Sequence, residues 1–302
     1  MLNRCPARAA RRNCWAGTPA GAALPPVLRP VPISYIPESM RAIIFVVIGL
    51  LVPSSLVFGQ TDEIQVYDTQ IAPPGIFNLM VHSNFTPEGR PVPVFPDSII
   101  ANHSFNGTAE WAYGVTPWME QGLYLPVYTL YSVNHEATIN GFKIRELFVR
   151  PRAQDHKFLY GINFEFSVNA LYWEDRRITS EIRPIVGLHL HRWDFIYNPI
   201  VDTNYTGGPG NLQFNPAGRV AYGLNDRWAI AAEEYDGFGP LRHFVPWSQQ
   251  FHEIWAVMDY VSPKLTGINV EAGIGYGLTP GSDKITLKLM LSRNLNSRSW
   301  RP

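Results

Sequence analysis

Residues 158–172 read FLYGINFEFSVNALY, and the alternation of apolar and polar side chains in this stretch decides the fold. Every even-numbered position is apolar or aromatic, whereas Asn163, Glu165, Ser167 and Asn169 occupy odd-numbered positions. Successive side chains of a β-strand point to opposite faces, so these two sets face opposite ways. The stretch is much longer than the roughly five or six residues of a globular strand. It therefore predicts a tilted strand that spans the hydrocarbon of a membrane.

Alternation and turn residues predict about a dozen strands between residues 76 and 294. An even number is what a single-chain bacterial barrel requires. We therefore expect an all-β fold, an antiparallel transmembrane β-barrel of about 12 strands with one face toward lipid and the other toward a polar lumen. The predicted strands are residues 76–84, 99–114, 118–131, 140–150, 157–173, 177–190, 192–199, 213–225, 227–236, 250–262, 266–278 and 284–294.

The links between the predicted strands are of two kinds, as expected where one rim of a barrel has tight turns and the other has longer loops. We expect the tight turns to face the periplasm. Aromatic residues near strand ends are expected to form girdles at the two membrane interfaces. The short links are 114–117, 224–227 and 262–264, and the long ones are 86–96, 202–209 and 237–247. The expected girdle residues are Trp111, Tyr113, Trp118, Trp173, Trp193, Trp228, Trp247 and Trp255.

A secretory signal peptide is predicted at residues 40–59, inside the chain. A short positive start is followed by the uncharged apolar run 42–58, and Val57 and Gly59 stand at the −3 and −1 positions of the expected cleavage site. Cleavage there makes Gln60 the first residue of the mature protein. An uncleaved membrane anchor is the alternative interpretation, although this run is at the short limit for a spanning helix.

Residues 1–39 are rich in Arg, Ala and Pro and show no strand or helix period. They are predicted to be a non-structural N-terminal extension, either an over-extended translation start before Met40 or a targeting segment. The barrel is then expected to comprise residues 60–302. No apolar run in that part approaches 18 residues, which excludes a helical membrane protein.

Removal of the first 59 residues leaves 19 basic against 24 acidic side chains, so no basic face recommends nucleic acid as a partner. Cys5 and Cys14 are lost with the same segment. The mature chain therefore has no disulfide scaffold and no thiolate metal site. No cofactor is expected.

Three predicted strands end in Tyr-Gly, a hydrophobic residue and Asn or Thr before a tight turn, at residues 112–116, 221–226 and 275–279. This pattern resembles proteobacterial outer-membrane β-barrels of the transporter type, loosely those catalogued with meta-pathway phenol degradation. The resemblance covers most of residues 76–294, and its motifs are turn signatures. It implies the outer membrane of a Gram-negative bacterium as the location and transport as the function. The lipid bilayer and the barrel-assembly machinery are then the expected partners.

Polar side chains inside the predicted strands are the candidates for the lumen lining. They either pair into an ion lattice that plugs the interior, or their excess of acids selects cations or polarised small solutes. The function expected from them is a passive channel or transporter for small solutes with an acidic, polar lumen. The candidates are Glu110, Asn163, Glu165, Ser167, Asn169, Glu233, Glu253, Asp259, Asn269, Glu271 and Lys288.

His189 and His191 are expected on one strand face, a spacing that can chelate a divalent metal when a third ligand is near. Two histidines alone do not define a site, so no metal is predicted. A lipid hydrolase in the barrel wall would need a serine activated by a histidine. Ser104 and Ser132 have histidines nearby but no nucleophile motif, so an enzyme is not the expected class. A closed structural or adhesive barrel and a soluble secreted all-β protein stay open as alternatives.

Overall fold

The computed structural model describes residues 62–296, so the predicted signal peptide and N-terminal extension lie outside the described residues. Within that range no helix is long and apolar enough to cross a membrane. Twelve long strands dominate the described chain: β1 Phe77–Glu88, β2 Ser104–Thr116, β3 Met119–Tyr131, β4 Thr138–Val149, β5 Phe158–Asn169, β6 Ile178–Leu190, β7 Trp193–Asn198, β10 Ala217–Gly223, β11 Trp228–Gly237, β13 Phe251–Tyr260, β14 Ile268–Gly277 and β15 Ile285–Asn294. The three short strands are β8 Val201–Thr203, β9 Gln213–Phe214 and β12 Gly239–Pro240.

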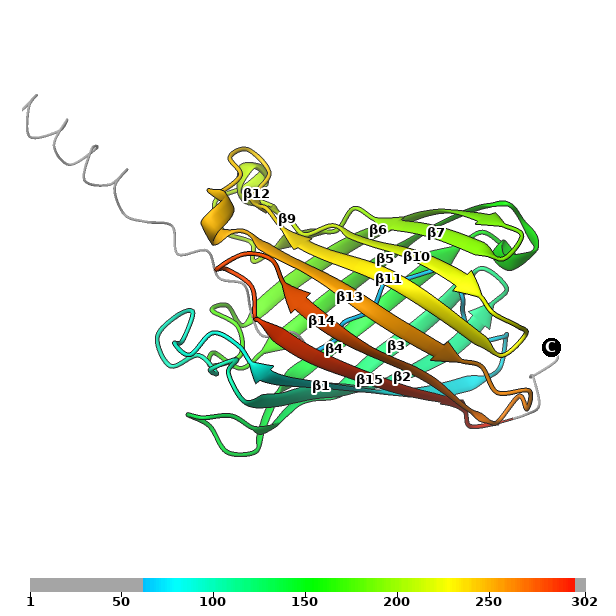
Figure 1. The fold of residues 1–302 in the computed structure, drawn as a ribbon, viewed down its shortest axis with the longest axis horizontal. Coiled ribbons are helices and arrows are strands. Elements are labelled where there is room, and N and C mark those ends of the chain that lie inside the picture. Colours follow the sequence, from blue (N-terminus) through cyan, green and yellow to red (C-terminus); the bar gives the residue numbers. More distant parts are fainter. Residues whose placement is uncertain (1–61, 297–302) are drawn as a thin grey trace, which may run out of the picture. The chain divides into compact units, whose positions relative to one another are not determined.

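The twelve long strands form a closed antiparallel barrel (Figure 1). Strand β1 pairs with β2 on one side and with β15 on the other. The pairing of β6 with β7 closes the ring, because β7 also pairs with β10. Closure leaves no sheet edge among these strands, which is the condition for a sheet to exist in lipid.

The wall of the barrel exposes apolar side chains and buries polar ones. On β5, the rings of Phe164 and Phe166 are about 40% exposed, whereas Asn163 and Glu165 are 5% exposed or less. A soluble protein shows the opposite distribution, because its polar groups face water and its apolar groups form the core. The outer surface of this barrel is therefore adapted to lipid.

The two ends of the barrel differ as the turn chemistry predicts. The short links join β2 to β3, β10 to β11 and β13 to β14, and they lie at the end where β1 begins and β15 finishes, which we call the turn end. The long links lie at the opposite end, which we call the loop end. The three short strands and most of the irregular chain are found there, on the left in Figure 1.

Several predicted boundaries and girdle residues are wrong. Strand β5 ends at Asn169 because the amides of Trp173 and Glu174 both donate to the carbonyl of Ala170 and turn the chain. Strand β2 begins at Ser104 instead of residue 99, and the segment 213–225 is divided between β9 and β10. Trp173 and Trp255 are buried inside the molecule and so do not belong to a membrane girdle.

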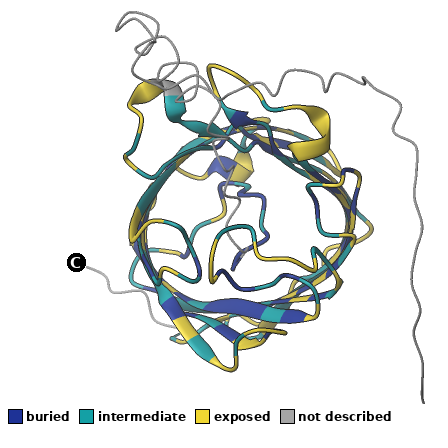
Figure 2. Ribbon diagram, turned by 90° about the vertical axis from the view of Figure 1, so that its left-hand side faces the viewer, coloured by how far each residue is buried: buried dark blue, intermediate teal, exposed yellow. Residues whose placement is uncertain are grey.

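Residues 62–76 precede the first strand, and the part from Asp62 to Ala72 lies inside the barrel. We call residues 62–72 the luminal segment. Asp62, Ile64 and Tyr67 are all about 5% exposed. The end-on view of Figure 2 shows buried chain within the ring of strands, where the contacts described below place this segment. Residues 62–72 therefore occupy part of the barrel lumen.

A positive charge on the outer wall should destabilise the barrel only at membrane depth. We expect Ile274→Arg, near the middle of β14, to lower the free energy of unfolding by about 2–4 kcal/mol. Ile274 and Leu265 are equally exposed, at 52% and 53%, but Leu265 lies in the turn between β13 and β14. Leu265→Arg is therefore the control and should cost at most about 1 kcal/mol. Urea titration of each variant refolded in lipid vesicles measures its free energy of unfolding. Equal losses of stability in the two variants would contradict the assignment of the outer wall to lipid.

Candidate functional site in the barrel lumen

The luminal segment is seated on apolar patches of the inner wall. Ile64 packs with Trp255, and Val66 packs in a cluster that includes Leu147 and Ile185. These wall residues point into the lumen, where neighbouring inward positions are charged. Burial of such side chains is favourable by about 1.5–3 kcal/mol each, so the segment gains stability from these contacts.

Wall side chains satisfy much of the backbone of the luminal segment. The side-chain amide of Asn198 accepts a hydrogen bond from the Tyr67 amide at 2.8 Å and donates one to the Tyr67 carbonyl at 3.0 Å. Nearer the turn end, the Ala72 amide donates to Glu120 Oε2 at 2.5 Å. The segment is thus bound through side chains of the wall, in contrast to the continuous backbone ladders of the barrel strands.

Arg145 on β4 joins two carboxylates of neighbouring strands. Its Nη2 atom lies 2.5 Å from Glu110 Oε1 and 2.6 Å from Glu120 Oε1. The second oxygen of Glu110 lies 3.0 Å from His82 Nε2. Gly122 makes room for the guanidinium, because a Cβ atom there would lie 2.6 Å from Arg145 Nε. Charged groups removed from water need such paired geometry to be tolerated.

Tyr67 connects this cluster to the next. Its hydroxyl lies 2.5 Å from the hydroxyl of Tyr124 on β3. The guanidinium of Arg183 lies 4.3 Å from the centre of the Tyr67 ring, and that of Arg145 lies 5.4 Å from it. Both distances are within the range of cation–π attraction. One side chain of the luminal segment is therefore held between two wall arginines.

Lys143 on β4 binds Asp62, the first residue of the luminal segment. Lys143 Nζ lies 2.9 Å from Asp62 Oδ1 and 3.8 Å from Glu165 Oε2. Asn163 donates to the other oxygen of Glu165 at 2.9 Å. Two wall strands, β4 and β5, thus contribute to one charged cluster around Asp62.

Arg183 on β6 is occupied by a neighbour on its own strand. Its Nε and Nη2 atoms donate to the two oxygens of Glu181 at 2.6 and 3.1 Å. Its Nη1 atom donates to the carbonyl of Gln65 at 3.0 Å, and Glu63 Oε1 lies 3.7 Å away. Glu63 therefore interacts with a cation whose stronger contacts are made elsewhere.

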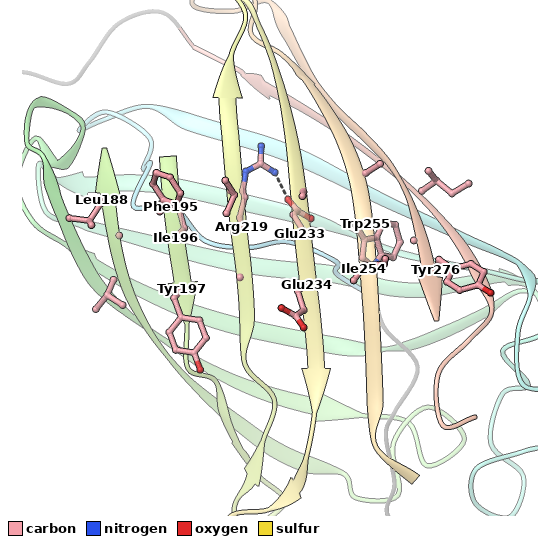
Figure 3. Close-up of a pocket in the computed structure, with 18 of the residues that line it drawn as sticks. Leu188, Phe195, Ile196, Tyr197, Arg219, Glu233, Glu234, Ile254, Trp255 and Tyr276 are labelled. Carbon is pink, nitrogen blue, oxygen red and sulfur yellow. Dashed lines mark hydrogen bonds and ion pairs between the residues drawn. The ribbon is translucent and has the colours of Figure 1, made fainter. Parts of the chain in front are cut away.

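The third cluster lies on the other side of the lumen. Lys288 Nζ lies 2.5 Å from Glu233 Oε2 and 2.6 Å from Glu271 Oε1. Arg219 pairs with Glu233 and with Asp259, and Figure 3 shows the first of these contacts. Lys288 also donates to the carbonyl of Ile64 at 3.1 Å. This cluster, too, is joined to the luminal segment.

The remaining predicted lumen residues make smaller contacts. Asn169 donates to Thr179 Oγ1 at 3.0 Å, and Ser167 lines the loop-end cavity described below. Glu253 accepts a hydrogen bond from Trp255 Nε1 at 3.2 Å. Asn269 accepts one from the Ser262 amide at 2.9 Å, near the turn end. These four residues lie outside the three ion clusters.

Polar cavities remain inside the barrel on both sides of the luminal segment. The loop-end cavity has a volume of about 300 Å³ and is lined by residues such as Glu63, Arg183 and Asp202. The turn-end cavity has a volume of about 240 Å³ and is lined by residues such as Tyr67 and Glu120. Gln65 of the luminal segment lines both cavities. The segment therefore separates two polar compartments.

A third hollow of about 1080 Å³ lies on the outer wall and is lined mainly by apolar, outward-facing side chains of β6, β7, β10, β11, β13 and β14. Gly218, Ala232 and Ala256 contribute small residues to it, and Tyr197 and Ile254 contribute large ones. Figure 3 shows this part of the wall. The hollow is on the lipid-facing surface and is distinct from the luminal cavities.

The histidine pair and the two serines do not form reactive sites in the described structure. Strand β6 ends at Leu190, and His191 follows in the turn with φ +63°, so His189 and His191 do not extend from one strand as expected. His189 Nδ1 instead lies 2.5 Å from Asp194 Oδ1. The hydroxyl of Ser132 donates to the backbone carbonyl of His135, and that of Ser104 accepts from Asn106. Neither hydroxyl contacts an imidazole in these hydrogen bonds.

The luminal segment is the element of the lumen that the sequence analysis missed. A signal for it exists in the strands, because Leu147, Ile185 and Ile196 interrupt the polar face of β4, β6 and β7. Apolar side chains on the inner face need an apolar partner inside the lumen, and Val66 supplies it. Ile64 and Val66 alternate with Glu63 and Gln65, but the alternation does not continue to residue 72, so it predicts no strand there.

Among solved structures, the chain is similar to a COG4313 outer membrane channel from Pseudomonas putida F1, with a TM-score of 0.54 and 12% sequence identity. The match covers 77% of this chain and 100% of that channel. The chain has the fold of an outer-membrane β-barrel. The predicted 12-strand fold and outer-membrane location are thereby confirmed, and the lipid bilayer is its environment.

Two further outer-membrane proteins match this barrel less well. A KdgM porin in complex with disordered oligogalacturonate has a TM-score of 0.45 and 8% identity, and the match covers 72% of this chain and 99% of that one. OprD of Pseudomonas aeruginosa has a TM-score of 0.32 and 11% identity, with 73% of this chain and 65% of that one covered. No protein-family model and no curated protein matches the sequence. The narrower resemblance to barrels of meta-pathway phenol degradation therefore stays a prediction.

The ion clusters of the outer-membrane barrel should be sensitive to loss of a single cation. We expect Lys288→Met to lower the free energy of unfolding by about 3–5 kcal/mol, because Glu233 and Glu271 would keep buried charges with one partner removed. Lys264→Met removes an exposed lysine from a turn and should change it by less than about 0.5 kcal/mol. Urea titration of both variants in lipid vesicles makes the comparison. An equal, small effect would show that Lys288 is not a structural partner of the two carboxylates.

Glu174 makes the stability of the loop end depend on pH. Burial and, to a smaller extent, the adjacent Asp175 raise the pKa of Glu174 to about 8 from its usual value of 4.5. Between these two pH values the folded barrel retains a proton that the unfolded chain loses. The free energy of unfolding should therefore fall as the pH rises from about 4.5 to about 8, and Glu174→Gln should reduce that fall. Denaturant titrations of the parent protein and of Glu174→Gln across this pH range test the prediction. The same pH profile in both proteins would contradict the raised pKa of Glu174.

Proposed function

We propose that this protein is a passive outer-membrane channel for small solutes, constricted by the luminal segment. The observation that carries the proposal is the pair of polar cavities at opposite ends of the lumen with residues 62–72 between them. A structural barrel has no need for two polar compartments. A channel uses them as vestibules on either side of a selective constriction.

The contacts of the luminal segment support a constriction that can rearrange. Side chains such as Asn198, Glu120 and Lys288 bind it one at a time, whereas each barrel strand is held by a continuous ladder. Local openings occur where fewer cooperative contacts must break at once. Displacement of the segment would join the two cavities into one aqueous path without any change in the wall.

The charges of the lumen favour cations over anions. In the turn-end cavity, Asp68, Glu110 and Glu120 are opposed by Arg145 among the lining residues. More carboxylates than cationic side chains also line the loop-end cavity. Carboxylates along a pore attract cations and exclude anions. The acidic, polar lumen expected from residues such as Glu165 and Glu271 is part of this proposal.

The route to the membrane belongs to the same proposal. We infer that residues 40–59 direct export and are cleaved, that residues 1–39 are not part of the fold, and that the barrel-assembly machinery inserts the mature chain. The resemblance to barrels of meta-pathway phenol degradation supports a transport role, and it does not define the solute. The contacts of Ser104 and Ser132 do not favour a wall hydrolase.

Conductance in a planar bilayer tests the channel. We expect the chain from Gln60 onward to show small, cation-preferring conductance, and a variant lacking residues 62–72 to conduct several-fold more, because the constriction is removed. Reversal potentials in a salt gradient measure the preference. The control replaces residues 62–72 by a Gly/Ser sequence of the same length, which fills space without ion pairs and should conduct intermittently.

Folding is verified in each sample by the mobility shift between unheated and boiled protein on detergent gels. Folded barrels that fail to conduct with and without residues 62–72 would overturn the channel and leave a closed structural barrel. Conductance that is the same in all three proteins would retain the channel but remove the luminal segment as its constriction.

A further inference from the structure

We propose that the loop-end cavity binds a small organic cation, namely a protonated amine carried on an apolar body, and that Glu63 is its principal ligand. The inference rests on the proposed channel function and names a class of solute for it. The cavity of about 300 Å³ is large enough for such a molecule. Its lining combines carboxylates from the luminal segment and from β5, β6 and β8 with aromatic rings.

Glu63 is a buried carboxylate whose charge is poorly compensated. Its side chain is 3% exposed, and neither oxygen has a hydrogen-bond partner among the described residues. The nearest cation, Arg183, lies 3.7 Å away and makes its two shortest contacts with Glu181. Burial of a carboxylate without hydrogen bonds is unfavourable, so a cationic donor that enters the cavity and binds Glu63 relieves part of that cost.

Other acceptor oxygens around the same cavity are also unused. Asp62 receives Lys143 on Oδ1, whereas its Oδ2 atom has no hydrogen-bond partner among the described residues. The side-chain amide of Asn215 donates to Asp202, and its own oxygen is likewise unpaired. An ammonium group has three donors and no acceptor, which matches a set of acceptors in need of donors.

The geometry favours an organic cation over a metal ion. No three Asp, Glu, His or Cys side chains of residues 62–296 are arranged to hold a metal. The lining of the cavity instead includes the aromatic residues Trp173, Tyr235 and Phe251. Aromatic faces attract both apolar groups and cations. A lining that combines carboxylates with aromatic side chains therefore fits an amine with an apolar body better than a bare ion.

Phenethylamine is the probe, with the uncharged 2-phenylethanol as its matched analogue. Isothermal titration of the detergent-solubilised barrel should show saturable binding of phenethylamine at one site, and at least tenfold weaker binding of the alcohol. Glu63→Gln should weaken phenethylamine binding at least tenfold, because the amide carries no charge. Glu136→Gln changes an exposed glutamate in the β3–β4 loop, outside the cavity, and should leave the affinity unchanged. Asp202→Asn replaces Glu63→Gln if that variant does not fold.

Any of the following three results would overturn the proposal that the loop-end cavity binds an organic cation through Glu63. Equal affinity for the alcohol would mean that the site recognises only the apolar body. Tighter binding of Ca²⁺ that displaces phenethylamine would identify a metal site. No effect of either carboxylate substitution would place the amine elsewhere. Bilayer conductance of the same preparation separates the two proposals: a conducting barrel that does not bind phenethylamine contradicts only the cation site, and a barrel that binds it but does not conduct contradicts only the channel.

Discussion

A bilayer offers the backbone no hydrogen-bond partners, and the rest of this structure depends on that constraint. The twelve-strand wall satisfies it by closing on itself through the pairing of β1 with β15. With apolar side chains required outside, every second residue of each strand must face inward, and polar groups collect there. Residues such as Arg145 and Lys288 then have no water-exposed alternative, so they form the paired clusters that fix the luminal segment in place.

The interior is thus neither an open tube nor a uniform lattice of ion pairs. The clusters around Arg145, Arg183 and Lys288 are closely paired, whereas Glu63 has no hydrogen bond within residues 62–296 and lies 3.7 Å from its nearest cation there, Arg183. The inserted chain explains the mixture. The luminal segment adds its own carboxylates to those of the wall strands. The cationic side chains of the wall are then shared among more carboxylates than there are cations to pair with them.

Strand number, strand location and the division into tight and long links are readable from the sequence, because the period of two and the turn residues are local signals. Strand ends are harder to predict from the sequence. Residues 170–172 continue the alternation of β5, but hydrogen bonds to the carbonyl of Ala170 form a turn that ends the strand before them. The inward orientation of Trp255 depends on the absence of a side chain at Gly275, a partner on another strand. The luminal segment is a long-range feature of the same kind, since its partners are distributed over the whole ring.

The glycines of the inner wall have a consequence for how such a lumen changes in evolution. A Cβ at Gly122 would lie 2.6 Å from Arg145, and one at Gly275 would lie 2.2 Å from the Trp255 ring. Arg145 and Trp255 therefore each lie in a recess of the neighbouring strand, where they take up less of the lumen. The free width of the lumen thus depends on these small residues as well as on the side chains that line it. Exchange of either glycine for alanine would leave the charge unchanged but would force the large side chain out of its recess and toward the centre of the lumen.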